Sequence, residues 1–246
     1  MRVFRVRAIN TALESDNRIH ADVTAVAYGF RGGLVPGVTV YGYMAEPVIQ
    51  YFGEQWLHRG AMTVRFKQPV YDGEEVRIEA RETDGKRLAV TVEQDRAEGV
   101  AWICDEPPQP PARQWTNAPA PARENRRPAS VDVFRPGAVL GSIAVQVNLA
   151  AAQVSRPLPA VIGESRCAHP AVLLSLANDL LIHNVVLGPW IHVSSEVTNF
   201  AAVHDGEFVT VRGNIAANFE RKATSLRRLM WLSTGQAARR CGRLTQ

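Results

Sequence analysis

The sequence predicts an α+β protein with two long central helices, each wrapped by an antiparallel β-sheet, and with the two sheets joined into one continuous sheet. Three observations lead to this prediction: an internal repeat, alternating apolar runs that follow Asp-Gly pairs, and one proline-rich interruption between the repeats. The chain has 246 residues, of which 46% are hydrophobic, so it is long enough to bury a substantial core.

The internal repeat relates residues 36–58 to residues 170–192. Both copies begin with a proline, continue through a long apolar stretch and end in a Trp-x-His sequence. Shifted by one residue, Asp72-Gly73-Glu74 corresponds to Asp205-Gly206-Glu207. Each copy therefore predicts an apolar helix, a Trp-bearing strand, an Asp-Gly hairpin turn and an alternating strand.

The first copy contains the clearest signals for single elements. Residues 2–7 alternate like a strand, and Asp22 is expected to cap a short helix over residues 23–28. Residues 38–52 carry apolar side chains at helical spacing, which predicts a buried helix. The two runs within residues 87–104 predict a hairpin that closes the first sheet.

Proline divides the chain into three parts. Seven of the 15 prolines lie between residues 107 and 128, which excludes a helix or a central strand there and favours an extended linker. We expect an N-terminal unit over residues 1–105 that carries the functional site, a linker over residues 106–130, and a C-terminal unit over residues 131–246. The second copy has Ala151 and Val154 in place of Asn17 and His20, two polar residues of the candidate site in the first copy. We therefore interpret the second copy as a scaffold and a wall of the substrate tunnel.

The candidate site lies where residues 15–20 precede a glycine-rich turn and the first central helix. His20 can carry a proton, and Asn17 can orient a water molecule or a carbonyl group. A glycine at a helix start leaves backbone N–H groups free, which suits negative charge developing on a carbonyl oxygen. The residues expected to contact the substrate at this helix start are Gly33, Val35, Pro36 and Gly37.

This stretch resembles the motif of the MaoC-like, (R)-specific enoyl-CoA hydratases of the hotdog fold. Asn17, His20 and Asp22 match their places in Asp-x-Asn-Pro-x-His-x-Asp. Gly29-Phe30 matches the turn that follows the motif, and Gly37 matches the glycine that opens the central helix.

The sequence departs from the family motif at several positions. Ser15 stands where the family has its catalytic aspartate, and the nearest acid, Asp16, follows one residue later. Arg18 replaces the proline of the motif, and Pro36 replaces the histidine before the helix-opening glycine. Ser15 is a poor base at neutral pH, so water activation would depend on His20.

The resemblance implies a double hotdog fold and a lyase that adds water to a trans-2-enoyl thioester, or removes it. His20 would exchange the proton, Asn17 would help to place water, and the N–H of Gly37 would hold the thioester oxygen; Ser15 and Asp16 complete the set of catalytic candidates. The expected partner is an acyl-CoA or acyl-carrier-protein thioester. Two alternatives stay open: a hotdog thioesterase that activates water with Glu46 or Asp16, and a non-catalytic acyl-thioester-binding protein.

Composition narrows the possible partners and the compartment. The net charge is +4, but residues 221–246 hold seven basic and no acidic residues, so we expect no nucleic-acid surface on the body of the protein. The three cysteines and six histidines show no metal-ligand spacing, and we expect neither a metal nor a cofactor. Residues 1–7 do not resemble a signal peptide, which favours a cytoplasmic protein without a membrane segment. The two copies would pair within the chain, and a further homo-oligomer is compatible with this.

Overall fold

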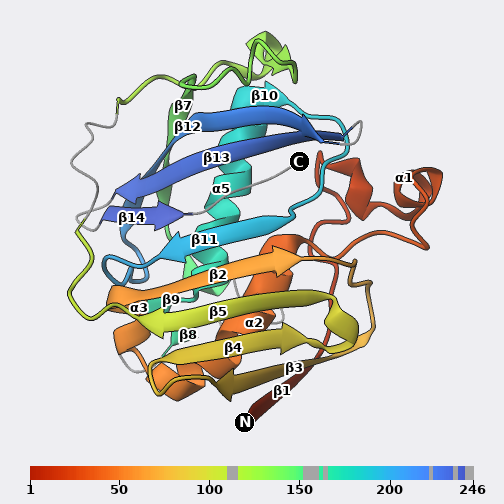
Figure 1. Cartoon of the computed structure of the whole chain (residues 1–246). Coiled ribbons are helices and arrows are strands. Elements are labelled where there is room, and N and C mark those ends of the chain that lie inside the picture. The colour runs from red at the N-terminus through yellow and green to blue at the C-terminus, as the bar shows by residue number, and fades with distance from the viewer. Residues whose placement is uncertain (110–115, 152–160, 163–165, 222–223, 235–237, 242–246) are drawn as a thin grey trace.

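The computed structural model describes residues 1–109, 116–151, 161–162, 166–221, 224–234 and 238–241. Ten strands form one antiparallel sheet in the order β1-β3-β4-β5-β2-β11-β14-β13-β12-β7 (Figure 1). The strands of the first half are β1 (Arg2–Arg7), β2 (Gly60–Phe66), β3 (Glu75–Glu82), β4 (Arg87–Val92) and β5 (Ala97–Ile103). Those of the second half are β7 (Val139–Gln146), β11 (Ser194–Thr198), β12 (Phe208–Arg221), β13 (Thr224–Thr234) and β14 (Ala238–Cys241).

The strand order reads as two copies of one arrangement that meet at the centre of the sheet. From the edge strand β1, the first half continues through β3, β4 and β5 and ends at β2. From the opposite edge strand β7, the second half continues through β12, β13 and β14 and ends at β11. The junction is the antiparallel pairing of β2 with β11, from Ala61 opposite Thr198 to Arg65 opposite Ser194. The pairing leaves no exposed sheet edge in the middle of the molecule.

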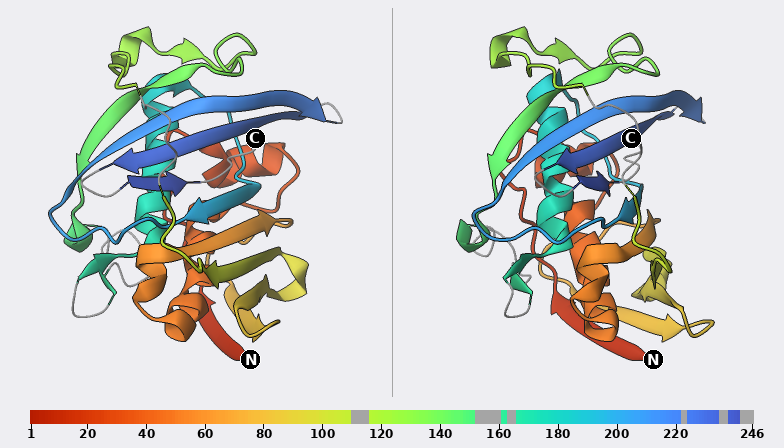
Figure 2. Two further views of the ribbon diagram at one scale, coloured as in Figure 1. Left: turned by 60° about the vertical axis from the view of Figure 1, so that its left-hand side comes forward. Right: turned by 90° about the vertical axis from the view of Figure 1, so that its left-hand side faces the viewer.

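Two long helices, α2 (Gly37–Phe52) and α5 (Pro170–Asn184), lie side by side on one face of this sheet. The turned views show both helices in the concavity of the curved sheet (Figure 2). Every residue of α2 from Val38 to Val48 is buried, because the sheet covers one side of the helix and α5 the other. Burial on all sides explains why the sequence of α2 is apolar almost throughout.

The remaining elements are short. They are the helices α1 (Asp22–Ala27) and α3 (Gln55–Arg59), the 3₁₀ turns η1 (Arg18–His20), η2 (Glu93–Asp95) and η3 (Arg123–Asn125), and the strands β6 (Arg127–Pro128), β8 (Val161–Ile162), β9 (Cys167–Ala168) and β10 (Val185–Val186). Strand β6 pairs with β10 and so fixes the end of the proline-rich segment beside the end of α5. Within the described residues, no helix is both long and apolar enough to cross a membrane.

The two Asp-Gly-Glu turns are held in the same way, which shows the duplication at atomic detail. In the first half, Gly73 donates to the carbonyl of Ala8 (2.8 Å), and Ala8 donates to the carbonyl of Glu74 (2.7 Å). In the second half, Gly206 and Glu207 make the corresponding pair of bonds with Val147, each 2.8 Å long. Both glycines have a positive φ, as expected in such turns.

Two local predictions are wrong. The Asp-Gly turns do not connect neighbouring strands of a hairpin, because β3 pairs with β1 and β4 rather than with β2. The Trp-bearing segments are not strands: Trp56 lies in α3, and Trp190 lies in an irregular segment that precedes β11. The strand after Trp56 starts at Gly60, where the indole ring of Trp56 covers the backbone and leaves no space for a side chain.

Candidate functional site

A cavity of about 240 Å³ opens at the N-terminus of α2. Both halves of the chain build it: the first contributes the segment around His20 and the start of α2, and the second contributes α5 and the segment before β11. The apolar side chains on its wall are Ile19, Phe30, Leu34, Val35, Val40, Phe66, Val70, Ile191 and Val193. The polar side chains are Asn17, His20, Lys67, Gln68, Asn178 and His192. An apolar wall with a few convergent polar groups is typical of a site for a small organic ligand.

The hydrogen bonds of His20 define its tautomer. Its Nδ1 lies 2.7 Å from the carbonyl oxygen of Leu34, and a carbonyl only accepts, so Nδ1 carries the hydrogen. Its Nε2 therefore holds the lone pair, 3.2 Å from the side-chain nitrogen of Asn17, which donates. Burial lowers the pKa of His20 below its ordinary value, although the bond to Leu34 opposes this shift. The ring is consequently neutral at neutral pH, and its basic nitrogen belongs to a side chain that lines the cavity.

Asn17 joins the two halves of the chain at this point. Its amide nitrogen donates to the carbonyl of Trp190 (2.9 Å), and its amide oxygen accepts from the N–H of Trp190 (3.1 Å). The same oxygen caps η1 through the N–H of Ile19 (3.5 Å). One buried side chain thus fixes the position of His20 and of the segment from the second half that faces it.

Ser15 and Asp16 line different cavities, and Asn17 lines both. The hydroxyl of Ser15 accepts from the N–H of Asn17 (3.1 Å) and lines a second cavity of about 310 Å³ that also contains His20. Asp16 is exposed and lines a third cavity, which it shares with Arg123 and Arg126. The two residues lie in a bend rather than in an extended segment, and the N–H of Ser15 donates to the carbonyl of Ala12 (3.0 Å).

The glycine-rich turn before α2 is fixed by close packing. A side chain at Gly33 would place its Cβ 2.2 Å from the carbonyl oxygen of His20, so only glycine fits. The N–H of Gly33 donates to the carboxylate of Asp22 (2.7 Å). The predicted cap by Asp22 is wrong: Ala21 is the N-cap of α1, and Asp22 instead ties the glycine-rich turn to this helix. Gly33 is not among the residues that line the cavity, whereas Val35, Pro36 and Gly37 are.

The start of α2 retains free N–H donors. Pro36 is the N-cap and makes no side-chain capping bond. Its carbonyl accepts from the N–H groups of Thr39 (2.9 Å) and Val40 (3.1 Å), whereas those of Gly37 and Val38 have no hydrogen-bond partner among the described residues. Gly37 is also a point of close contact with the second half, because a Cβ at this position would lie 2.7 Å from the Cβ of His192. The helix start therefore presents backbone donors at a place where only glycine allows the two halves to meet.

His192 is a residue of this site that the sequence analysis treated only as part of the repeat. Its Nε2 lies 2.7 Å from the hydroxyl of Ser195 and 3.1 Å from the carbonyl of Ser194, which requires a hydrogen on Nε2 if the carbonyl is its partner. Its Nδ1 is buried and has no hydrogen-bond partner among the described residues. Burial lowers the pKa of His192 to about 3, so the ring is neutral. The repeat did not indicate that His192 lies at this site. It relates His192 to His58, which the structure places in α3 with its ring exposed.

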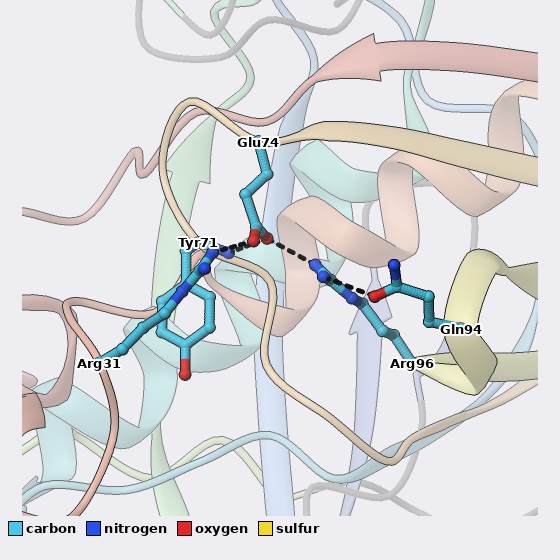
Figure 3. Close-up of polar contacts among 5 residues, drawn as sticks. All are labelled: Arg31, Tyr71, Glu74, Gln94 and Arg96. Atoms are coloured by element: carbon cyan, nitrogen blue, oxygen red, sulfur yellow. Dashed lines mark hydrogen bonds and ion pairs between the residues drawn. The ribbon is translucent and has the colours of Figure 1, made fainter.

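An ionic network holds the glycine-rich turn from outside the cavity (Figure 3). The carboxylate of Glu74 pairs with Arg31 on one oxygen and with Arg96 on the other, and the second oxygen also accepts from the N–H of Tyr71 (3.0 Å). The guanidinium group of Arg31 stacks over the ring of Tyr71 at 4.2 Å. The turn that precedes α2 is thereby tied to the Asp-Gly-Glu turn of the first half.

Glu46 lies elsewhere, in the core between the two central helices. One of its carboxylate oxygens is 3.1 Å from Nε2 of His169, the fully buried N-cap residue of α5, without the alignment of a hydrogen bond. Glu46 is not among the residues that line the cavity at His20. In the described part of the chain, no three His, Cys, Asp or Glu side chains are grouped so that they could hold a metal ion.

Comparison with known proteins places the fold. No family model matches the chain, and no curated protein matches it. A conserved protein of Mycobacterium tuberculosis with a double hotdog fold is 17% identical, with a TM-score of 0.58, over 100% of this chain and 96% of its own. A MaoC domain protein of Chloroflexus aurantiacus, provisionally assigned as a dehydratase, is 13% identical with a TM-score of 0.59, over 100% of this chain and 95% of its own. This chain has the double hotdog fold.

A third similar structure has a different assigned activity. A protein of Lactobacillus plantarum, provisionally assigned as an oleoyl thioesterase, is 11% identical with a TM-score of 0.50, over 98% of this chain and 94% of its own. The resemblance to the MaoC-like dehydratases is thus confirmed at the level of the fold. Since the same fold also carries a thioesterase assignment, the chemistry has to be argued from the site.

Proposed function

We propose that the protein is an acyl-thioester hydratase or dehydratase of the MaoC-like type, acting on a trans-2-enoyl thioester or its 3-hydroxy product. One observation carries the proposal: a neutral histidine with a basic Nε2 and a helix start with free N–H donors line the same largely apolar cavity. The apolar wall suits an acyl chain, and the two polar features suit the two places where a hydration reaction develops charge.

Each residue of the site has a separate role in the proposed reaction. The N–H of Gly37 holds the thioester oxygen and stabilises the negative charge that this oxygen gains when water adds to the β-carbon. Nε2 of His20 exchanges the hydrogen bond that Asn17 donates to it for one from the attacking water, takes a proton from this water and returns a proton to the α-carbon, so that the elements of water are added across the double bond. Asn17 keeps the ring of His20 in place and orients the water. Ser15 positions Asn17 through its backbone bond.

The unit over residues 1–105 supplies these chemical groups, and the residues after the proline-rich linker supply a wall of the cavity. Asn178, Trp190 and His192 are the parts of this wall that lie next to Asn17 and Gly37. The thioesterase alternative through Glu46 has less support, because the carboxylate of Glu46 is directed at His169 rather than at the cavity of His20.

The test is a pair of simultaneous assays on the purified protein with a short-chain and a long-chain trans-2-enoyl-CoA. Loss of the enoyl absorbance reports hydration, and a thiol reagent reports hydrolysis. We expect hydration, a decrease of about 10²- to 10⁴-fold in His20→Ala, and no change in the matched control His58→Ala, whose ring is exposed. Ser15→Asp should increase hydration, because it restores a carboxylate to the second cavity beside His20.

Three results would contradict the proposal. Full activity of His20→Ala would exclude His20 as the proton carrier. Thiol release without hydration, abolished by Glu46→Gln, would establish the thioesterase instead. Tight binding of enoyl-CoA without turnover in the wild-type protein and in Ser15→Asp would establish a binding protein.

A further inference from the structure

The third cavity, of about 290 Å³, is adjacent to the proposed active site and has a different character. Two arginines from the proline-rich segment, Arg123 and Arg126, line it together with Asp16. Its apolar part comes from the end of α5 and the segment that leads to Trp190. The cavity that contains His20 and Gly37 differs, because its described lining includes one cationic residue, Lys67, and no arginine.

The arginines are held in place by the backbone around them. The 3₁₀ turn η3 begins at Arg123, and the strand that follows it, β6, pairs with β10, so that Arg127 lies opposite Val185. The N–H of Ala129 donates to the carbonyl of Val186 (2.9 Å), which continues this attachment. The proline-rich segment is thus fixed beside the end of α5 at the point where it presents its arginines.

The Nε donor of Arg126 is not used by the part of the protein that the structure describes. Its Nε is buried and has no hydrogen-bond partner among the described residues. Neither arginine forms an ion pair within the described part of the chain, and Asp16, the one acid on the cavity wall, is exposed. A guanidinium group offers a planar fork of N–H donors that matches the geometry of a phosphate. A ligand in the cavity would be bound by the terminal Nη groups, because the buried Nε has almost no surface open to a ligand.

The position of this cavity indicates which phosphate it would take. Asn17 and Trp190 line both this cavity and the cavity at His20, so the two cavities adjoin on either side of this hydrogen-bonded pair, and an elongated ligand that passes around the pair would reach both. We infer that Arg123 and Arg126 bind a phosphate of the pantetheine-based head group whose thioester reaches His20. This inference rests on the proposed function and adds to it the residues that recognise the head group. The phosphate can belong to coenzyme A or to the phosphopantetheine of a carrier protein.

Calorimetry with free coenzyme A tests the inference without any turnover. We expect Arg126→Gln and Arg123→Gln each to weaken binding about 10- to 100-fold, the range for loss of a hydrogen bond to a charged group. Asp16→Asn should tighten binding, because it removes the one negative charge on the cavity wall. The matched control is Arg81→Gln, an exposed arginine on β3 that lines none of the three cavities around Asn17. Arg126→Lys keeps the charge and should recover part of the affinity, and thermal unfolding of each variant checks that it is folded.

Truncated head groups separate the sources of the phosphate. Pantetheine, which has no phosphate, should bind equally to the wild-type protein and to Arg126→Gln. If 4′-phosphopantetheine shows the full effect of Arg126→Gln, the arginines read the phosphate common to coenzyme A and carrier proteins; if only coenzyme A shows it, they read the nucleotide end. In turnover, Arg126→Gln should raise KM for enoyl-CoA and leave kcat and the KM for enoyl-pantetheine unchanged.

Failure of this inference is distinguishable from failure of the proposed function. Equal affinity of the wild-type protein, Arg126→Gln and Arg123→Gln for coenzyme A would overturn the phosphate site, even if hydration depends on His20. It would leave the arginines with a structural role at the C-terminal end of α5, where a cation is favoured by the helix dipole. Absence of hydration combined with arginine-dependent binding of coenzyme A would overturn the proposed reaction and retain the site.

Discussion

Replacing Asn17 with alanine should damage stability and activity together, and a second asparagine provides the comparison that separates the two effects. Asn17 makes two hydrogen bonds to the backbone of Trp190, 2.9 and 3.1 Å long, and one to His20. Asn199 is equally buried and donates to the carbonyl of Trp56 (2.9 Å), the residue that corresponds to Trp190 in the repeat. Only Asn17 touches a residue of the proposed reaction.

The expected loss of stability follows from the groups left without partners. Asn17→Ala leaves a buried N–H and a buried C=O of Trp190 unpaired, at about 1–3 kcal/mol each, so the free energy of unfolding should fall by about 2–6 kcal/mol. Asn199→Ala leaves one carbonyl unpaired and should cost about 1–3 kcal/mol. Both costs are a substantial fraction of a total stability of about 5–15 kcal/mol, typical of folded proteins.

Urea unfolding at neutral pH measures both costs, and hydration assays under conditions where each variant is folded measure activity per folded molecule. Asn17→Ala should lower kcat because the ring of His20 loses the side chain that fixes it, whereas Asn199→Ala should leave kcat unchanged. The reasoning would be refuted if both variants lowered kcat equally, or if Asn17→Ala were no less stable than Asn199→Ala.

Three further predictions concern the surroundings of the site. Gly37→Ala should lower stability by about 1–3 kcal/mol and reduce turnover, because its methyl group would lie 2.7 Å from the Cβ of His192; Gly188→Ala, which meets no atom within 4 Å, is the control in the same unfolding and activity assays. The pKa of His192 is about 3 in the folded state and 6.5 when exposed, so the unfolded state binds a proton first as the pH falls. The free energy of unfolding in urea should therefore fall by up to about 1.4 kcal/mol per pH unit between pH 6.5 and 3. His192→Gln should reduce this dependence of stability on pH. Glu74→Gln should raise KM and lower the melting temperature more at low than at high salt, whereas Glu207→Gln, at the corresponding turn without these arginine contacts, should change neither.

Local patterns in the sequence were sufficient to predict the two central helices. The apolar spacing after Pro36 and its repetition after Pro170 predict helices that the structure places at Gly37–Phe52 and Pro170–Asn184. The hairpin over residues 87–104 is also confirmed, as β4 and β5. These features depend on residues close in sequence, where periodicity and turn residues carry the information.

The features that the sequence did not predict depend on contacts between distant residues. An Asp-Gly pair specifies a turn but not which strands lie beside it, so the pairing of β3 with β1 could not be deduced. The contact between Gly37 and His192, and the clamp between Asn17 and Trp190, join the two halves of the chain and have no local signature. The roles proposed for His20 and Gly37 came from the family resemblance, and the assays described above are their test.

The two helix starts differ in a way that explains why the duplicated fold should use only one of them. At α5, Pro170 has no N–H, Nδ1 of His169 accepts the N–H of Ala171 (3.1 Å), and the carbonyl of His169 accepts the N–H of Val172 (2.9 Å), so protein groups occupy the first donors of this helix. At α2, Pro36 offers no side-chain acceptor, and the N–H groups of Gly37 and Val38 have no hydrogen-bond partner among the described residues, beside a cavity.

This asymmetry predicts the number of ligands that the protein binds. A helix start whose first donors are already satisfied gains little from a ligand oxygen, whereas a free one gains a new hydrogen bond in a site sheltered from water. We therefore expect a titration with a non-hydrolysable enoyl-CoA analogue to saturate at one ligand per chain. His169→Ala should not create a second site of similar affinity, because the side chains around Glu46 still fill the core there. Two equivalent sites per chain in the wild-type protein would show that α5 also binds substrate, and the division of labour between the two halves would then be wrong.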